Sequence, residues 1–117
     1  MKLRYTPEAI SDLQNIKSYI GTNLRNPGAA NRITKMILDQ CASLKRFPRA
    51  GVELSALTGY ETDVRMLVCE NYLALYRLDA ETVSVARIIN ARQDYMRILF
   101  HGEDLDEFQR QQRQHCE

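Results

Sequence analysis

Three runs of alternating residues follow one another closely in the second half of this chain, over Asp63–Cys69, Tyr72–Leu78 and Thr82–Asn90. The links between them are only two and three residues long, Glu70-Asn71 and Asp79-Ala80-Glu81. Links this short join antiparallel neighbours, because a parallel pair needs a crossover of about a dozen residues or more. We therefore expect an antiparallel meander, which commits the chain to a fold built on a sheet.

Two amphipathic helices are expected before the meander, and each has a proline directly after a capping residue. Thr6-Pro7 opens the first helix and Asn26-Pro27 opens the second. The expected apolar stripes are Ile10, Leu13, Ile16 or Lys17, Ile20 and Leu24 in the first helix, and Ala30, Ile33, Met36 or Ile37, Cys41 and Leu44 in the second. The first helix ends near 23–26, so the short link predicts an antiparallel helical hairpin.

The other segments complete the expected fold. They are a first strand over Lys2–Tyr5, a break at Phe47–Gly51, an irregular polar loop over 52–62 and a short helix over Asp94–Phe100. The order βααβββ predicts an α+β domain in which the helical hairpin packs on one face of a small, mainly antiparallel sheet. Residues 1–100 form this single domain, and the hydrophilic tail over 101–117 is helical or disordered.

Charge is distributed unevenly, although the 117-residue chain carries a formal net charge of only +1. Residues 1–59 hold nine Lys or Arg against four acids, a net +5, and residues 60–117 hold seven against eleven, a net −4. Without the tail, residues 1–100 carry about +4. This charge suits an acidic protein or a nucleic acid as partner, without distinguishing between them.

The three cysteines, Cys41, Cys69 and Cys116, form no CxxC pair and follow no signal peptide. We expect neither a disulfide scaffold nor a metal site, and we interpret Cys41 and Cys69 as small buried hydrophobes. No apolar run approaches the length of about 20 residues that a membrane span needs. The expected protein is therefore cytoplasmic, without a metal, a cofactor or a membrane partner.

Five segments in this order resemble the RelE/ParE family of toxins from bacterial toxin-antitoxin modules. They are PEAISDLQNIKSYI, NPGAANRI, LKRFPRAG, VRMLVCENYLALYRL and RIINARQDYMRILF, all within residues 1–100. The resemblance implies a growth-inhibiting toxin of the plasmid-stabilisation type that a cognate antitoxin neutralises. A homodimer and a toxin-antitoxin heterotetramer are both compatible with it.

Two mechanisms occur in this family, and the resemblance implies different residues for each. RelE-like members cleave mRNA on the ribosome, whereas ParE-like members act on DNA gyrase by binding. For a metal-independent endoribonuclease, Arg65 matches the family's arginine early in the second strand and Arg92 its basic residue after the last strand. Tyr95 completes this candidate catalytic set.

Proton transfer is the weak point of the ribonuclease hypothesis. Many relatives carry a histidine or tyrosine where this chain has Asn90, and asparagine transfers no proton. Both histidines, His101 and His115, lie beyond the matched region, and no basic residue stands between Arg49 and Arg65. The remaining substitutes, Tyr95, Glu53, Glu61 and Asp94, would each need a pKa shift of several units to work near pH 7.

Each candidate also has a purely structural interpretation. Arg65 can be a strand residue paired with an acid, Tyr72 and Tyr76 can be core or sheet-surface aromatics, and Arg92 with Asp94 can be a local ion pair. Arg87 is expected on one strand face with Val83, Val85 and Ile89. Such a half-buried arginine needs either an internal acid or an antitoxin carboxylate.

We therefore favour a ParE-like toxin that acts by binding. The candidate target- or antitoxin-binding residues are Arg32, Lys35, Arg87, Arg92, Asp94 and Tyr95. The alternative is a RelE-like mRNA interferase acting on the ribosome, and a degenerate toxin or repurposed interaction domain ranks third. The chain has no Gly-rich phosphate loop and no Ser/His/Asp arrangement, which disfavours a metabolic enzyme.

Overall fold

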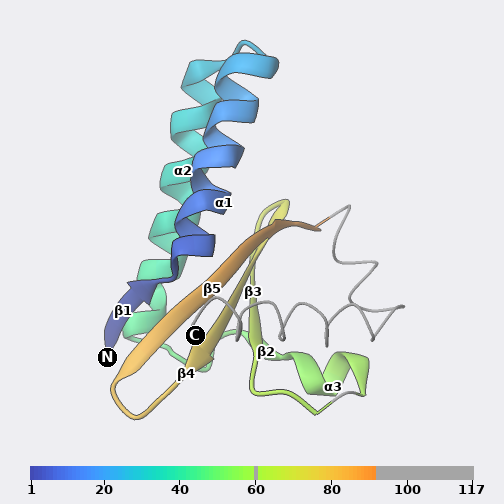
Figure 1. The fold of residues 1–117 in the computed structure, drawn as a ribbon. Coiled ribbons are helices and arrows are strands. Elements are labelled where there is room, and N and C mark those ends of the chain that lie inside the picture. Colours follow the sequence, from blue (N-terminus) through green and yellow to red (C-terminus); the bar gives the residue numbers. More distant parts are fainter. Residues whose placement is uncertain (60, 92–117) are drawn as a thin grey trace.

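A computed structural model of the chain describes residues 1–59 and 61–91. It has the expected α+β fold, in which helices pack on a sheet (Figure 1). Its elements are β1 (Lys2–Tyr5), α1 (Pro7–Ser18), a π-helix (Tyr19–Asn23), α2 (Pro27–Ala42), a 3₁₀-helix (Ser43–Lys45), β2 (Val52–Glu53), α3 (Leu54–Thr58), β3 (Arg65–Cys69), β4 (Tyr72–Leu78) and β5 (Thr82–Asn90). No helix in this part of the chain is both long and apolar enough to cross a membrane.

Both helix starts have the predicted caps. The Thr6 hydroxyl accepts a hydrogen bond from the Ala9 amide at 3.1 Å, and the Asn26 side chain accepts one from the Ala29 amide at 3.1 Å. α1 continues into the π-helix, after which Arg25 adopts a left-handed φ of 54°. This reversal lets α2 return beside α1 as the expected hairpin (Figure 1).

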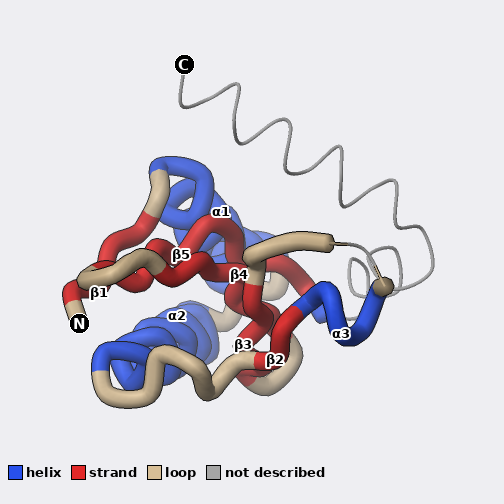
Figure 2. The backbone as a smooth tube through the Cα atoms, turned by 90° about the horizontal axis from the view of Figure 1, so that it is seen from below, coloured by secondary structure: helices blue, strands red, loops and turns tan. Residues whose placement is uncertain are grey.

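The sheet has five strands in the order β1-β5-β4-β3-β2, with α3 beyond β2 (Figure 2). The last three strands form the predicted antiparallel meander. β1 pairs in parallel with β5, with Lys2 opposite Thr82 and Tyr5 opposite Val85. The N-terminal strand thus lies at the edge of the sheet next to the last strand.

A bulge in β5 changes which side chains share a face. Leu75 lies opposite Arg87 and Tyr76 opposite Val85, so Ala86 is the extra residue. Before the bulge Val83 and Val85 contact the helices, and after it Ile88 does so while Ile89 faces the other way. The predicted common face of Val83, Val85, Arg87 and Ile89 is therefore wrong beyond Val85.

Two apolar clusters lie on the two faces of the sheet. The larger joins Ala9 of α1 and Ile37, Cys41 and Leu44 of α2 to Cys69, Ala74, Tyr76, Val83, Val85 and Ile88. The smaller joins Leu54 of α3 to Val64, Met66, Leu73, Leu75 and Ile89. Cys41 and Cys69, which are 0% and 1% exposed, are confirmed as buried hydrophobes.

Several expectations about the helices and loops need correction. Ile10 is 46% exposed, because the buried stripe of the first helix passes through Ala9 instead, and Leu24, just after the π-helix, is 56% exposed. The segment expected to be an irregular loop contains β2 and α3, and the strand expected from Asp63 begins at Arg65. The stripe of the second helix is confirmed. The helix predicted over 94–100 and the tail lie outside the described residues.

Candidate functional site

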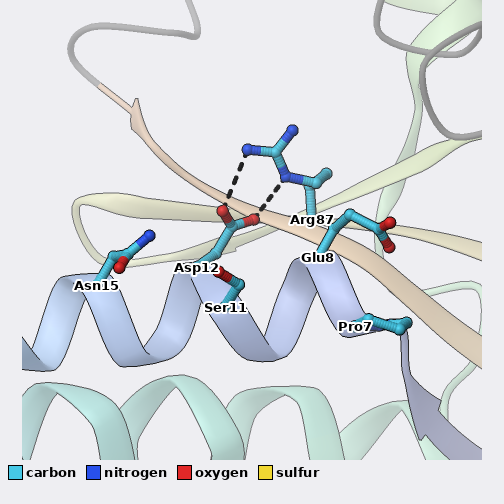
Figure 3. Close-up of a pocket in the computed structure, with 6 residues that line it drawn as sticks. All are labelled: Pro7, Glu8, Ser11, Asp12, Asn15 and Arg87. Carbon is cyan, nitrogen blue, oxygen red and sulfur yellow. Dashed lines mark hydrogen bonds and ion pairs between the residues drawn. The ribbon is translucent and has the colours of Figure 1, made fainter. Parts of the chain in front are cut away.

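The seam between α1 and β5 contains a bidentate ion pair (Figure 3). Arg87 donates from Nε to Asp12 Oδ2 at 2.6 Å and from Nη2 to Asp12 Oδ1 at 3.1 Å. The Ile88 amide also donates to Asp12 Oδ2, at 2.9 Å. Asp12 therefore accepts hydrogen bonds from a guanidinium and from a backbone N–H of β5. Both donors lie beyond Val85, the last residue of β5 that pairs with β1.

This pairing follows from the local sequence of α1 and from the length of β1. β1 stops at Tyr5, so the edge of β5 beyond Val85 would otherwise have unpaired backbone groups. The Thr6 hydroxyl donates to the Ala86 carbonyl at 2.8 Å, and Asp12 accepts from Ile88 two turns later along α1. Helix α1 thus covers the part of the β5 edge that no strand covers.

Two pockets adjoin along this seam and share Asp12, Asn15 and Arg87. The polar pocket, of about 430 Å³, is lined by Pro7, Glu8, Ser11, Asp12, Asn15 and Arg87. The aromatic pocket, of about 410 Å³, is lined by Asp12, Asn15, Ile16, Tyr19, Tyr72, Arg87, Ile88, Ile89 and Asn90. Both pockets are open to the surface rather than enclosed.

Two phenols distinguish the aromatic pocket. Tyr19 is 55% exposed on the π-helix, and Tyr72 is half-buried at the start of β4. Burial raises the pKa of Tyr72, and the neighbouring Tyr19 raises it further. The Tyr72 phenol therefore stays protonated at neutral pH and can donate a hydrogen bond.

Arg65 lies at the start of β3, which β4 separates from β5, and its contacts stabilise the fold. Its side chain is 14% exposed, and its Nη1 pairs with Glu53 Oε1 at 3.1 Å while its Nη2 donates to the Arg49 carbonyl at 3.2 Å. Its buried Nε has no hydrogen-bond partner in the described part of the chain. The guanidinium thus fastens β2 and the preceding loop to β3, as the structural interpretation of Arg65 predicted.

The structure does not bring the other predicted site residues together. Arg65 and Arg87 belong to strands that β4 divides, and they lie opposite Tyr76 and Leu75, which face different sides of the sheet. Arg32 and Lys35 are exposed on α2. Arg92, Asp94 and Tyr95 lie outside the described residues, so their predicted roles stay predictions.

Sequence reasoning missed Asp12, the internal acid that Arg87 required. A signal was present, because Asp12 interrupts the buried stripe of α1 three residues after Ala9 and four before Ile16. An acid at such a position needs a partner from another element. The two tyrosines fit their structural interpretation as core or sheet-surface aromatics, because Tyr76 is buried in the larger cluster and Tyr72 is half-buried against it.

The two pockets present carboxylates, phenols, amides and one guanidinium. Asn90 lines the aromatic pocket but cannot exchange a proton, and Glu53 is engaged by Arg65. Residues 1–59 and 61–91 contain no group of three His, Cys, Asp or Glu side chains placed to hold a metal ion. The mixed polar and apolar lining of the two pockets can contact a partner's side chains and backbone.

Comparison with known proteins identifies a matching family and a similar solved structure. A family model described as the ParE toxin of the type II toxin-antitoxin system parDE matches residues 3–95. A solved structure titled "Chromosomal ParDE TA system from P. aeruginosa" is similar, with 25% sequence identity and a TM-score of 0.64. That similarity covers 77% of this chain and 95% of the other. No curated protein matches.

Proposed function

We propose that this chain, which belongs to the ParE toxin family of type II toxin-antitoxin systems, inhibits growth by binding DNA gyrase in the cytoplasm. Family membership makes it the toxin component of such a system. The observation that supports binding over catalysis is the state of Arg65. This arginine would have to stabilise the phosphate in RNA cleavage, but it is mostly buried and already holds Glu53 and the Arg49 carbonyl.

We further propose that a cognate antitoxin neutralises the chain. Arg32 and Lys35 are exposed cations on α2 and can meet acidic side chains of that partner. Arg87 is less suited to this role, because Asp12 already pairs with its guanidinium. We retain Arg92, Asp94 and Tyr95 as candidates for contact with the target or the antitoxin. The domain proposed for this function is residues 1–100.

A ribosome-dependent mRNA interferase is the second candidate. Arg65 stands where the family's ribonucleases place an arginine, and its Nε donor is unused within the described residues. This function would also require a proton-transfer pair, for which Glu61, Asp94 and Tyr95 stay candidates.

The two candidates can be separated with the purified chain. We expect inhibition of DNA supercoiling by gyrase, relief of that inhibition by the product of the adjoining reading frame, and no cleavage of mRNA on programmed ribosomes. Cleavage that is lost in Arg65→Ala would overturn the binding proposal. Arg77→Ala is the matched control, because Arg77 also pairs with an acid, Asp63, at 3.0 Å. Thermal unfolding of both variants establishes that they are folded.

A further inference from the structure

The segment that joins α2 to β2 carries a cluster of unbalanced positive charge (Figure 2). Residues 40–52 contain three cations, Lys45, Arg46 and Arg49, and no acid. All three are exposed, and none forms an ion pair within the described part of the chain. We call residues 45–49 the basic loop, which carries a net charge of +3.

An aromatic ring stands in the middle of this charge. Phe47 is 64% exposed, the largest exposed fraction among the large hydrophobic residues that the structure describes. It follows two of the cations directly and precedes the third by two positions, and it belongs to neither apolar cluster. The ring therefore adds little to the core and is available to a partner.

The backbone of the basic loop is fixed by hydrogen bonds. The amides of Arg46 and Phe47 both donate to the Ser43 carbonyl, at 3.1 and 3.0 Å. The hydroxyl of the buried Tyr76 donates to the Pro48 carbonyl at 2.8 Å. Phe47 is thus held outward on a preorganised segment, so a partner that contacts it pays little for ordering the backbone.

These side chains match the chemistry of a single-stranded nucleic acid. Lys and Arg contact phosphates, and an exposed aromatic ring stacks on a base. In a duplex the bases already stack on one another, so the ring would meet no free face. An acidic protein would also attract the cations, but its apolar anchors fill concave pockets. No residue of the basic loop lines either pocket of the α1–β5 seam, and its ring projects instead.

We propose that the basic loop binds single-stranded DNA, with the Phe47 ring stacked on a base and the three cations on neighbouring phosphates. The choice of DNA over RNA rests on the proposed function, because gyrase acts on DNA. The stacking is independent of sequence, since every base has a π-face. Three phosphate contacts predict that log K falls with log[salt] with a slope of about −2.

Fluorescence anisotropy with a labelled thymidine oligonucleotide of about 12 nucleotides tests the stacked ring. We expect Phe47→Ala to weaken binding by the full chain roughly 5- to 100-fold, because the base loses its stacking partner. Tyr19→Ala is the matched control, since Tyr19 is 55% exposed on the π-helix, outside the basic loop. Thermal unfolding establishes that both variants are folded.

The salt dependence of the same binding tests the three cations. Replacing all three by Gln (Lys45→Gln, Arg46→Gln and Arg49→Gln) should bring the slope from about −2 to about zero. A control with Lys17→Gln, Arg32→Gln and Lys35→Gln removes the same charge from exposed positions of the helical hairpin. It should keep the slope of about −2.

Several outcomes would overturn the basic loop as a site for single-stranded DNA. They are no binding by the wild-type chain, unchanged affinity in Phe47→Ala, and equal slopes in the two triple variants. Equal binding of a duplex would contradict the stacked base, and tighter binding of a uridine RNA would contradict the choice of DNA. Stronger competition by polyglutamate than by unlabelled oligonucleotide would place an acidic protein there instead. The proposed function fails separately, if the chain does not inhibit supercoiling by gyrase.

Discussion

At the scale of single residues, Tyr76 shows how a polar group is satisfied in the core. Its side chain is 0% exposed, and its hydroxyl accepts from the Gly51 amide at 2.9 Å and donates to the Pro48 carbonyl at 2.8 Å. Gly51 must lack a side chain, because a Cβ there would lie 2.6 Å from the Tyr76 ring and 2.9 Å from the Met66 carbonyl. One phenol thus fixes the loop between α2 and β2.

Removing that hydroxyl should destabilise the fold. We expect Tyr76→Phe to lower the free energy of unfolding by about 1–3 kcal/mol, because the Gly51 amide and the Pro48 carbonyl lose a buried partner. Urea denaturation measures the change. Tyr72→Phe serves as the control, since Tyr72 is only half-buried. Equal stability of the two variants would contradict this account of the loop.

The Arg87–Asp12 pair is expected to be worth more than an exposed ion pair. The two side chains are 29% and 15% exposed, and two hydrogen bonds join them. A double-mutant cycle with Asp12→Asn and Arg87→Gln should give a coupling of about 1–2 kcal/mol in unfolding. The same cycle on Arg77 and Asp63, where Asp63 is 73% exposed, should give less than about 1 kcal/mol. Equal couplings would show that burial of the first pair has no effect.

At the scale of elements, the turn between β4 and β5 depends on one carboxylate. Asp79 accepts hydrogen bonds from the amides of Glu81 at 3.0 Å and Thr82 at 2.7 Å. These bonds lower the pKa of Asp79, chiefly through the Glu81 amide. A carboxyl with a lower pKa in the folded state stabilises that state above its unfolded pKa of about 3.9.

That stabilisation should disappear in acid. As pH falls from about 4 through the lower folded pKa, Asp79 becomes protonated and its contribution is lost. Asp79→Asn keeps a side-chain acceptor but does not titrate, so its unfolding free energy should fall less over this range than that of the wild-type chain. Denaturation at pH 6 and pH 2.5 compares the two proteins. Parallel losses would mean that other carboxyl groups account for the whole acid sensitivity.

The elements that could be predicted from sequence are those with enough residues to show a period. The β4 and β5 bounds and both helix caps were correct, because alternation and capping chemistry are local. β2 has two residues and α3 has five, so neither shows a readable pattern. The bulge at Ala86 could not be predicted, because β-branched residues both before it (Val83, Val85) and after it (Ile88, Ile89) fit a regular strand. The partner of Arg87 could not be predicted either, because it comes from another element through tertiary packing.

At the scale of the whole molecule, the expected boundary at Phe100 can be tested directly. Within the described residues 1–59 and 61–91, both apolar clusters are already complete layers on the two faces of the sheet. A chain ending at Phe100 should therefore unfold cooperatively, within about 3 °C of the full chain, while its net charge rises from +1 to +4. Calorimetry measures the melting temperature. Loss of the cooperative transition would place the domain boundary further along the chain.

The parallel pairing of β1 with β5 has a consequence for synthesis on the ribosome. Residues 2–5 find their sheet partners only at 82–85, after about 80 intervening residues have been added. The helical hairpin can form early, but the sheet that it packs against stays incomplete until β5 has left the exit tunnel. A nascent chain therefore cannot complete its sheet until β5 has been made, so an antitoxin produced beside it can meet each chain as it is finished.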